Sequence, residues 1–226
     1  MKISYSTPIR DRLQHLKITL PVSLRENAGL DVEFIISDSG SIDGLEEWIY
    51  SSFPSELESG FLKYFKTPAS EFWESSKEKN LAHSYSSGVV VCNLDADNLV
   101  TREFTVGAIE TFERNINSIL NFQGCGNMGG GCGRVALSAE NFKALGGYDE
   151  AFKDGWGGDD TDLIKRAIAF GVENVFEGVG SLFFLNHNND LRGRYMKNKD
   201  LTATARAVYD QSKENILNNK LVANLK

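Results

Sequence analysis

The sequence predicts an α/β fold in which a mostly parallel central sheet is flanked by helices. Two observations support this prediction. The first half of the chain alternates short apolar runs with segments of helical periodicity, and the connections between them are short. That order is typical of a parallel sheet with helices on its faces. A length of 226 residues and a hydrophobic content of 41% suit one domain with a substantial core.

The elements of the first half follow from their residue patterns. Leucines recur at helical spacing at positions 13, 16, 20 and 24, and we expect Pro21 to kink or interrupt that helix. Further helices are expected at residues 44–53 and 77–87. Strands are expected at residues 2–6, 32–37, 61–65 and 88–95.

The second half predicts a different order of elements. Residues 102–118 have helical spacing, with Phe104, Ile109, Phe112 and Ile116 on one side. A glycine-rich loop at residues 124–133 would give clearance for a bulky substrate. Beyond it we expect a strand at 134–138, a helix from Ser138 as N-cap to Gly146, a helix at 159–171, and closing strands at 172–177 and 181–186. From about Leu201 the tail is a polar, weakly amphipathic helix whose role the sequence does not indicate.

Composition and charge limit the classes of function. The chain has 24 basic and 31 acidic residues, a net charge of −7 and a pI of about 5.1. A nucleic-acid partner is therefore not expected, because such binding needs a basic surface. An acidic protein that handles an anionic substrate needs local positive charge, which a metal ion would supply.

Cysteine usage and the N-terminal sequence indicate a cellular location. The three cysteines are odd in number and lack metal-ligand spacing, which favours a reduced, cytoplasmic setting. The N-terminal residues have no apolar stretch of the kind found in a signal peptide. Peripheral association with a membrane, through the tail helix, stays open.

Polar residues follow three of the expected strands at the point where each one ends. Thr7 and Pro8 follow the first strand, Asp38 ends the second, and Asp95 and Asp97 end the buried run before residue 95. In an open parallel sheet, ligands bind at the carboxyl ends of the strands. These positions are therefore expected to converge on one edge and to form a site there.

Asp95 and Asp97 are close carboxylates that follow a buried strand. Such carboxylates repel one another unless they are protonated, paired or bound to a cation. Mg²⁺ and Mn²⁺ prefer oxygen ligands, often one or two carboxylates completed by substrate phosphates and water. A solvated strand end is the alternative interpretation, because D-x-D is common by chance.

Asp38, the pair Asp159 and Asp160, and His187 each have a functional and a structural interpretation. Asp38 either accepts hydrogen bonds from a bound nucleoside or forms an Asx-type turn. Asp159 and Asp160 either begin a helix, where negative charge is favourable, or accept a proton from a sugar hydroxyl beside the Trp156 ring. His187 either completes a metal site or is a surface residue.

The motifs of the first half resemble those of the inverting glycosyltransferases of the GT-A fold, family 2. Residues 38–43 (DSGSID) approximate the strand-end pattern D-D-G-S-x-D, with Ser39 in place of the second Asp. Lys79-Asn80 matches the K/R-N element of that family, and Asp95-Ala96-Asp97 matches its D-x-D motif.

The second half is similar to the β-1,4-galactosyltransferases and to bacterial chondroitin-polymerase-like domains. Residues 146–150 (GGYDE) correspond to G-G-[FY]-D-E, and residues 155–160 (GWGGDD) correspond to G-W-G-G-E-D. The resemblance spans roughly residues 3–190. It implies a single GT-A domain over residues 1–226, with a nucleotide-binding half at 1–100, an acceptor-binding and catalytic half at 101–190, and a helical tail at 191–226.

The resemblance also implies roles for individual residues. Asp97 would be the principal ligand of Mn²⁺ or Mg²⁺, His187 a second ligand, and Asp95 would lie near the ribose or the metal. Asp160 would be the general base. The substrates would be bound by Asp38 at the uracil, by Thr7, Pro8 and Arg10 around the nucleotide, by Lys79 and Asn80, and by Trp156, Gly157 and Asp159 at the acceptor.

The expected activity is transfer of a hexose or N-acetylhexosamine from a UDP-sugar to a hydroxyl of a glycan or glycolipid acceptor. Inversion needs one base, because the leaving diphosphate takes no proton, unlike the sugar leaving group of a glycosidase. A nucleotidyltransferase is the second enzymatic hypothesis, although its glycine- and lysine-rich loop is absent after the first strand. A non-catalytic, lectin-like protein is the third hypothesis, and it has no reason to bind UDP.

Overall fold

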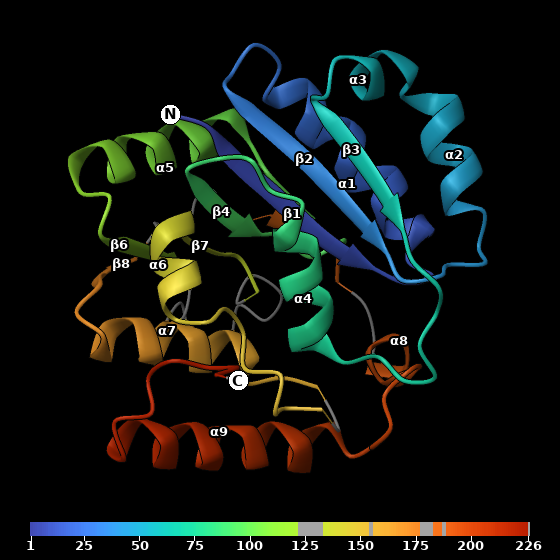
Figure 1. Cartoon of the computed structure of the whole chain (residues 1–226). Coiled ribbons are helices and arrows are strands. Elements are labelled where there is room, and N and C mark those ends of the chain that lie inside the picture. Colours follow the sequence, from blue (N-terminus) through green and yellow to red (C-terminus); the bar gives the residue numbers. More distant parts are fainter. Residues whose placement is uncertain (122–132, 154–155, 177–182, 187–188, 226) are drawn as a thin grey trace.

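The computed structural model describes residues 1–121, 133–153, 156–176, 183–186 and 189–225, and Figure 1 presents the chain. The main sheet has strand order β3-β2-β1-β4-β7-β6-β8, and β5 pairs with β9 in a second, two-stranded sheet. The strands are β1 (Ile3–Ile9), β2 (Val32–Asp38), β3 (Leu62–Lys66), β4 (Val90–Asn93), β5 (Asn98–Leu99), β6 (Ser118–Asn121), β7 (Val135–Ser138), β8 (Glu173–Phe176) and β9 (Phe183–Phe184). The helices are α1 (Leu13–Glu26), α2 (Leu45–Ser52), α3 (Pro54–Glu58), α4 (Ser75–Ser84), α5 (Arg102–Arg114), α6 (Ala139–Ala144), α7 (Asp159–Ala169), α8 (Asn189–Gly193) and α9 (Leu201–Leu217).

The predicted mostly parallel sheet is confirmed. β1 pairs in parallel with β2 and β4, β2 pairs in parallel with β3, and β6 pairs in parallel with β8. Among the strands that the structure describes in this sheet, β7 alone runs antiparallel to both of its neighbours, β4 and β6. The carboxyl ends of β1, β2 and β4 therefore share one edge, where the polar residues that follow them meet.

Apolar side chains cover both faces of the sheet, because successive residues of a strand point to opposite sides. In β4, Val90 and Cys92 belong to one buried cluster and Val91 belongs to the other. The first cluster includes residues of α1, α2 and α5, and the second includes residues of α7. Helices thus flank the sheet on both sides, as Figure 1 shows. In the part of the chain that the structure describes, every helix is too short or too polar to span a bilayer.

Pro21 does not interrupt α1, and the helix predicted at residues 102–118 is shorter than expected. α1 continues through Pro21 to Glu26, because the buried Leu16, Leu20 and Leu24 hold the helix on the sheet despite the missing N–H of the proline. α5 ends at Arg114, not at residue 118, so Ile116 lies outside it and is 46% exposed.

The missed strand β6 begins directly after α5. Its four residues, SILN, pair with β7 and β8 and are all buried. Periodicity cannot distinguish so short an apolar run from the last turn of a helix.

A buried ion cluster joins three strands at the other end of the sheet from the polar strand ends. Glu33 has no exposed side-chain surface, and its carboxylate lies 2.8 Å from the Nζ atoms of both Lys2 and Lys63. Ser4 Oγ and the Ser87 backbone N–H also donate to it, at 2.6 and 2.7 Å. Burial alone would raise the pKa of Glu33, but these hydrogen bonds outweigh burial and lower the pKa to about 2.

Replacing Glu33 with Gln is expected to lower the free energy of unfolding at pH 7 by about 2–3 kcal/mol. Because the folded-state pKa is lowered from 4.5 to about 2, the stabilisation is present above pH 4.5 and is lost as the pH falls toward 2. Urea denaturation at several pH values measures both effects. In Glu46→Gln, which breaks an exposed pair with Lys66, the loss should be small. An equal loss in the two variants would contradict the special role of the buried carboxylate.

Candidate active site

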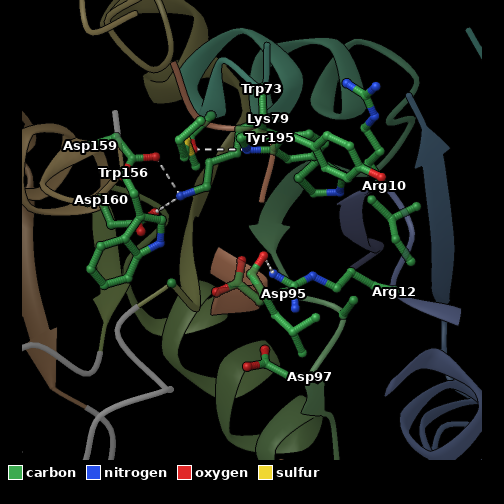
Figure 2. Close-up of a pocket in the computed structure, with 18 of the residues that line it drawn as sticks. Arg10, Arg12, Trp73, Lys79, Asp95, Asp97, Trp156, Asp159, Asp160 and Tyr195 are labelled. Carbon is green, nitrogen blue, oxygen red and sulfur yellow. Dashed lines mark hydrogen bonds and ion pairs between the residues drawn. The ribbon is translucent and has the colours of Figure 1, made fainter. Parts of the chain in front are cut away.

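A cavity of about 380 Å³ opens beyond the carboxyl ends of β1 and β4. Figure 2 shows Asp95 and Asp97 on one wall, the pair Asp159 and Asp160 on another, and Arg10 across from them. Residues from distant parts of the sequence line this cavity, among them Pro8, Arg10, Arg12, His15, Trp73, Lys79, Asp95, Asp97, Trp156, Gly157, Asp159, Asp160, Tyr195, Ala205 and Tyr209.

The D-x-D segment lies in a turn between β4 and β5. The Asn98 backbone N–H donates to the Asp95 carbonyl at 2.9 Å, so the chain reverses within the motif and both carboxylates can border one cavity. Asn93 Nδ2 donates to Asp95 Oδ1 at 3.2 Å, and Asn98 Nδ2 donates to Asp97 Oδ1 at 2.7 Å. The buried Arg134 supports the turn through its 2.9 Å hydrogen bond to the Leu99 carbonyl.

These two carboxylates fit a hard divalent cation. Burial raises the pKa of Asp95, Lys79 opposes that rise and the charge of Asp97 adds to it. A cation between the aspartates would relieve this repulsion, and substrate oxygens and water commonly complete such a site. The described residues contain no cluster of three His, Cys, Asp or Glu side chains that could hold a metal by themselves.

His187 lies outside the described residues. The segment just before it is anchored at the D-x-D motif, because the Leu185 backbone N–H donates to the Asp97 carbonyl at 2.8 Å. Of the predicted metal ligands, Asp95 and Asp97 line the same cavity. The glycine-rich loop predicted at residues 124–133 also lies outside the described residues, apart from Gly133.

Asp159 and Asp160 occupy the N-terminus of α7 and share one lysine. Lys79 Nζ, from α4, lies 2.7 Å from Asp159 Oδ2 and 2.7 Å from Asp160 Oδ1. The Lys79 and Asp159 side chains are each 8% exposed, whereas Asp160 is 17% exposed. Figure 2 shows the ammonium group between the two carboxylates.

One ammonium group cannot neutralise several carboxylates. Burial raises the pKa of Asp160 to about 7; Lys79 opposes this rise, while Asp159 and Asp95 add to it. Burial alone would lower the pKa of Lys79, but Asp159 and Asp160 outweigh it, so the lysine stays protonated. A carboxylate that titrates near neutrality at the wall of a cavity is suited to accept a proton from a bound hydroxyl.

Asn80 holds the GGYDE segment in place and is not among the residues that line the cavity. Its Oδ1 accepts from the Tyr148 backbone N–H at 2.8 Å, and its Nδ2 donates to the Tyr148 carbonyl and to Glu150 Oε1. Lys79 Nζ lies 4.9 Å from the centre of the buried Tyr148 ring. The Lys79-Asn80 pair therefore joins α4 to both motifs of the second half.

The tail helix α9 supports the loop that carries Trp156. Thr204 Oγ1 accepts from the Trp156 backbone N–H and donates to its carbonyl, both at 3.3 Å. Gly157 and Gly158 have positive φ angles of 89° and 91°, and a Cβ at Gly158 would lie 2.7 Å from a methyl carbon of Val208. The two glycines thus allow the loop to turn closely against α9 before α7 begins.

The residues predicted to surround the nucleotide divide into two groups. Pro8 and Arg10 line the cavity, whereas Thr7 and Asp38 are buried and are not among its lining residues. Asp38 Oδ1 accepts from the Ser41 backbone N–H at 2.7 Å, as in the turn considered from the sequence, and Oδ2 accepts from the Tyr64 hydroxyl at 2.6 Å.

Sequence reasoning did not identify several of the lining residues. Arg12 and His15 follow Arg10 closely in the sequence. The short distance in sequence from Arg10 could have indicated that Arg12 also lines the cavity. The guanidinium of Arg10 lies 3.9 Å from the centre of the Tyr195 ring, and the Trp73 backbone N–H donates to the Tyr195 carbonyl. No pattern in the sequence brings Trp73 and Tyr195 together, because 121 residues separate them and only tertiary packing joins them.

Solved structures of glycosyltransferases have the same fold. The mannosyltransferase PcManGT from Pyrobaculum calidifontis, in complex with GDP-Man and Mn²⁺, matches with a TM-score of 0.64 at 15% identity, over 80% of this chain and 55% of that one. GalNAc-T7 with UDP, GalNAc and Mn²⁺ matches with a TM-score of 0.62 at 15% identity, over 78% of this chain and 42% of that one. This chain has the GT-A glycosyltransferase fold.

A third structure extends the GT-A likeness to the tail. S. aureus TarS 1-349 matches with a TM-score of 0.70 at 13% identity, over 100% of this chain and 67% of that one. TarS 1-349 has also been solved with UDP and with UDP-GlcNAc.

One protein-family model also matches part of the sequence. It is described as the N-terminal domain of galactosyltransferase and covers residues 121–188, the segment that contains the GGYDE and GWGGDD motifs. No curated protein matches this sequence.

Proposed function

We propose that this chain is a metal-dependent inverting glycosyltransferase that moves a hexose or N-acetylhexosamine from a UDP-sugar to a hydroxyl of a glycan acceptor. One observation carries the proposal. A single cavity combines a carboxylate pair suited to a metal diphosphate, Asp95 and Asp97, with a second pair, Asp159 and Asp160, beside the Trp156 ring. The first pair belongs to the donor side and the second to the acceptor side.

The donor would lie against Pro8 and Arg10, with its diphosphate toward Asp95 and Asp97. Mn²⁺ or Mg²⁺ held by Asp97, with Asp95 and His187 beside it, would supply Lewis-acid stabilisation of the charge that develops on the leaving UDP. Arg10 and Arg12 add fixed positive charge at the same cavity. Asp38 and Thr7 are buried and do not line the cavity, so they would act on the nucleotide only indirectly.

The acceptor sugar would stack on Trp156, with one hydroxyl at Asp160. Asp160 removes the proton of that hydroxyl, whose oxygen attacks the anomeric carbon of the donor. The bond between that carbon and the phosphate oxygen breaks, and its electron pair leaves with UDP. Because attack comes from the face opposite UDP, the configuration inverts. Lys79 orients Asp159 and Asp160, and its charge opposes the rise in the pKa of Asp160.

Uridine and the metal are proposed for this chain by analogy with structural neighbours. TarS and GalNAc-T7 are solved with UDP, and GalNAc-T7 and the mannosyltransferase are solved with Mn²⁺. The mannosyltransferase carries GDP-Man, so a guanine nucleotide is the natural comparison in any donor screen.

Donor hydrolysis tests the proposal without knowledge of the acceptor. With Mn²⁺, at least one of UDP-glucose, UDP-galactose, UDP-GlcNAc and UDP-GalNAc is expected to release UDP slowly, and EDTA should stop the release. GDP-mannose serves as the comparison donor. Release of pyrophosphate from UTP and a sugar 1-phosphate would instead favour a nucleotidyltransferase. Saccharide binding with no affinity for UDP would favour the lectin-like alternative.

A further inference from the structure

The tail helix α9 contributes side chains to the cavity as well as supporting its loop. Ala205 and Tyr209, four residues apart on the same face of α9, line the cavity together with Trp156. Figure 1 shows α9 running alongside α7, the helix that begins with Asp159 and Asp160. The tail is therefore part of the wall on the acceptor side.

Two aromatic side chains on this wall are partly exposed. Trp156 is 37% exposed and Tyr209 is 42% exposed. Lys165 Nζ lies 5.8 Å from the centre of the Tyr209 ring, on the neighbouring helix α7. A partly exposed tyrosine offers an apolar ring surface and a hydroxyl, and the Lys165 ammonium over the ring adds a hydrogen-bond donor. A sugar presents an apolar face and hydroxyl groups in return.

We propose that Tyr209 of α9 forms a second acceptor subsite, which binds the sugar next to the one that reacts at Trp156 and Asp160. The inference rests on the proposed function and adds that the acceptor is an oligosaccharide. Trp156 can stack on only one sugar ring. Tyr209 lies on a separate element of the same wall, so a second sugar of the acceptor would contact it while the first stays beside Asp160.

The alternative is that Tyr209 is an exposed residue of a supporting helix and contacts no substrate. Exposed aromatic side chains occur singly on many protein surfaces. On that view, α9 would act only through Thr204 and the close packing of Gly157 and Gly158, and an acceptor of one sugar would react as well as a longer one.

The test compares acceptors of one and two sugars. The probes are the methyl β-glycosides of glucose, galactose and GlcNAc and the methyl glycosides of the corresponding β-1,4-linked disaccharides, with the donor that hydrolysis identifies. In the native chain, kcat/KM for at least one disaccharide is expected to exceed that for its monosaccharide by about tenfold, the size of one good aromatic contact. In Tyr209→Ala, this ratio should fall to about two or less, whereas Tyr209→Phe should keep most of it because the ring remains.

Leu217→Ala is the matched control, because Leu217 is on α9, is 77% exposed and is not among the residues that line the cavity. Its ratio of disaccharide to monosaccharide should equal that of the native chain. Three results would overturn the subsite: no disaccharide advantage, an advantage that survives in Tyr209→Ala, or donor hydrolysis without transfer to any disaccharide. Absence of donor hydrolysis would instead overturn the proposed function, so the two failures are distinguishable.

Discussion

Asp160→Asn is expected to reduce the rate of sugar transfer about a thousandfold and to leave Mn²⁺-dependent UDP binding unchanged. The amide cannot accept the proton of the acceptor hydroxyl, yet it keeps the shape of the side chain beside Lys79. Transfer kinetics and calorimetric titration of UDP measure the two quantities separately.

Asp159→Asn is the matched comparison for this variant, because Asp159 also lies 2.7 Å from Lys79 Nζ. If Asp159 binds the acceptor, its loss should raise KM for the acceptor more than it lowers kcat. A thousandfold loss of kcat in Asp159→Asn, with activity retained in Asp160→Asn, would exchange the two assignments.

The assignment of Asp160 as the general base also predicts how kcat/KM depends on pH. Because the pKa of Asp160 is raised to about 7, the base is protonated in acid, and kcat/KM should rise with pH until about 7 and then level off. A raised folded-state pKa also means that the stabilising contribution of Asp160 is present below pH 3.8 and is lost as the pH rises through 7. The free energy of unfolding of Asp160→Asn at pH 8 should therefore equal or exceed that of the native chain. This result would show that the loss of transfer does not come from misfolding.

Asp97→Ala is expected to weaken the binding of UDP in Mn²⁺ by at least about a hundredfold, because loss of a direct ligand costs no less than loss of a supporting residue. In EDTA, the native chain should bind as weakly as the variant. Asp31→Ala is the control, because Asp31 is 64% exposed and outside the cavity. If Asp97→Ala keeps its Mn²⁺-dependent affinity for UDP, the D-x-D motif does not bind the donor.

Sequence reasoning located the carboxylates that border the cavity because their signals are local. An apolar run that ends in polar residues predicts both a buried strand and a site at its end, and β4 with Asp95 and Asp97 is such a case. The helix start at Asp159 was also predictable, since glycines precede it and acidic residues fill its first turn.

Local signals were insufficient where packing decided the structure. The short run at β6 joins the sheet because β7 and β8 offer it backbone partners. α1 continues through Pro21 because its leucines are buried against the sheet. Asp38 follows its strand as expected, but its carboxylate turns inward to Ser41 and Tyr64.

The sequence by itself determined the fold class, the four parallel strands of the first half and the carboxylates that border the cavity, because periodicity and strand-end chemistry depend on neighbouring residues. Only the tertiary structure decided that Lys79 contacts both Asp159 and Asp160, about eighty residues away, and that α9 lines the same cavity as Trp156. Contacts between distant segments depend on how helices pack around the sheet, and no local pattern in the chain encodes that packing.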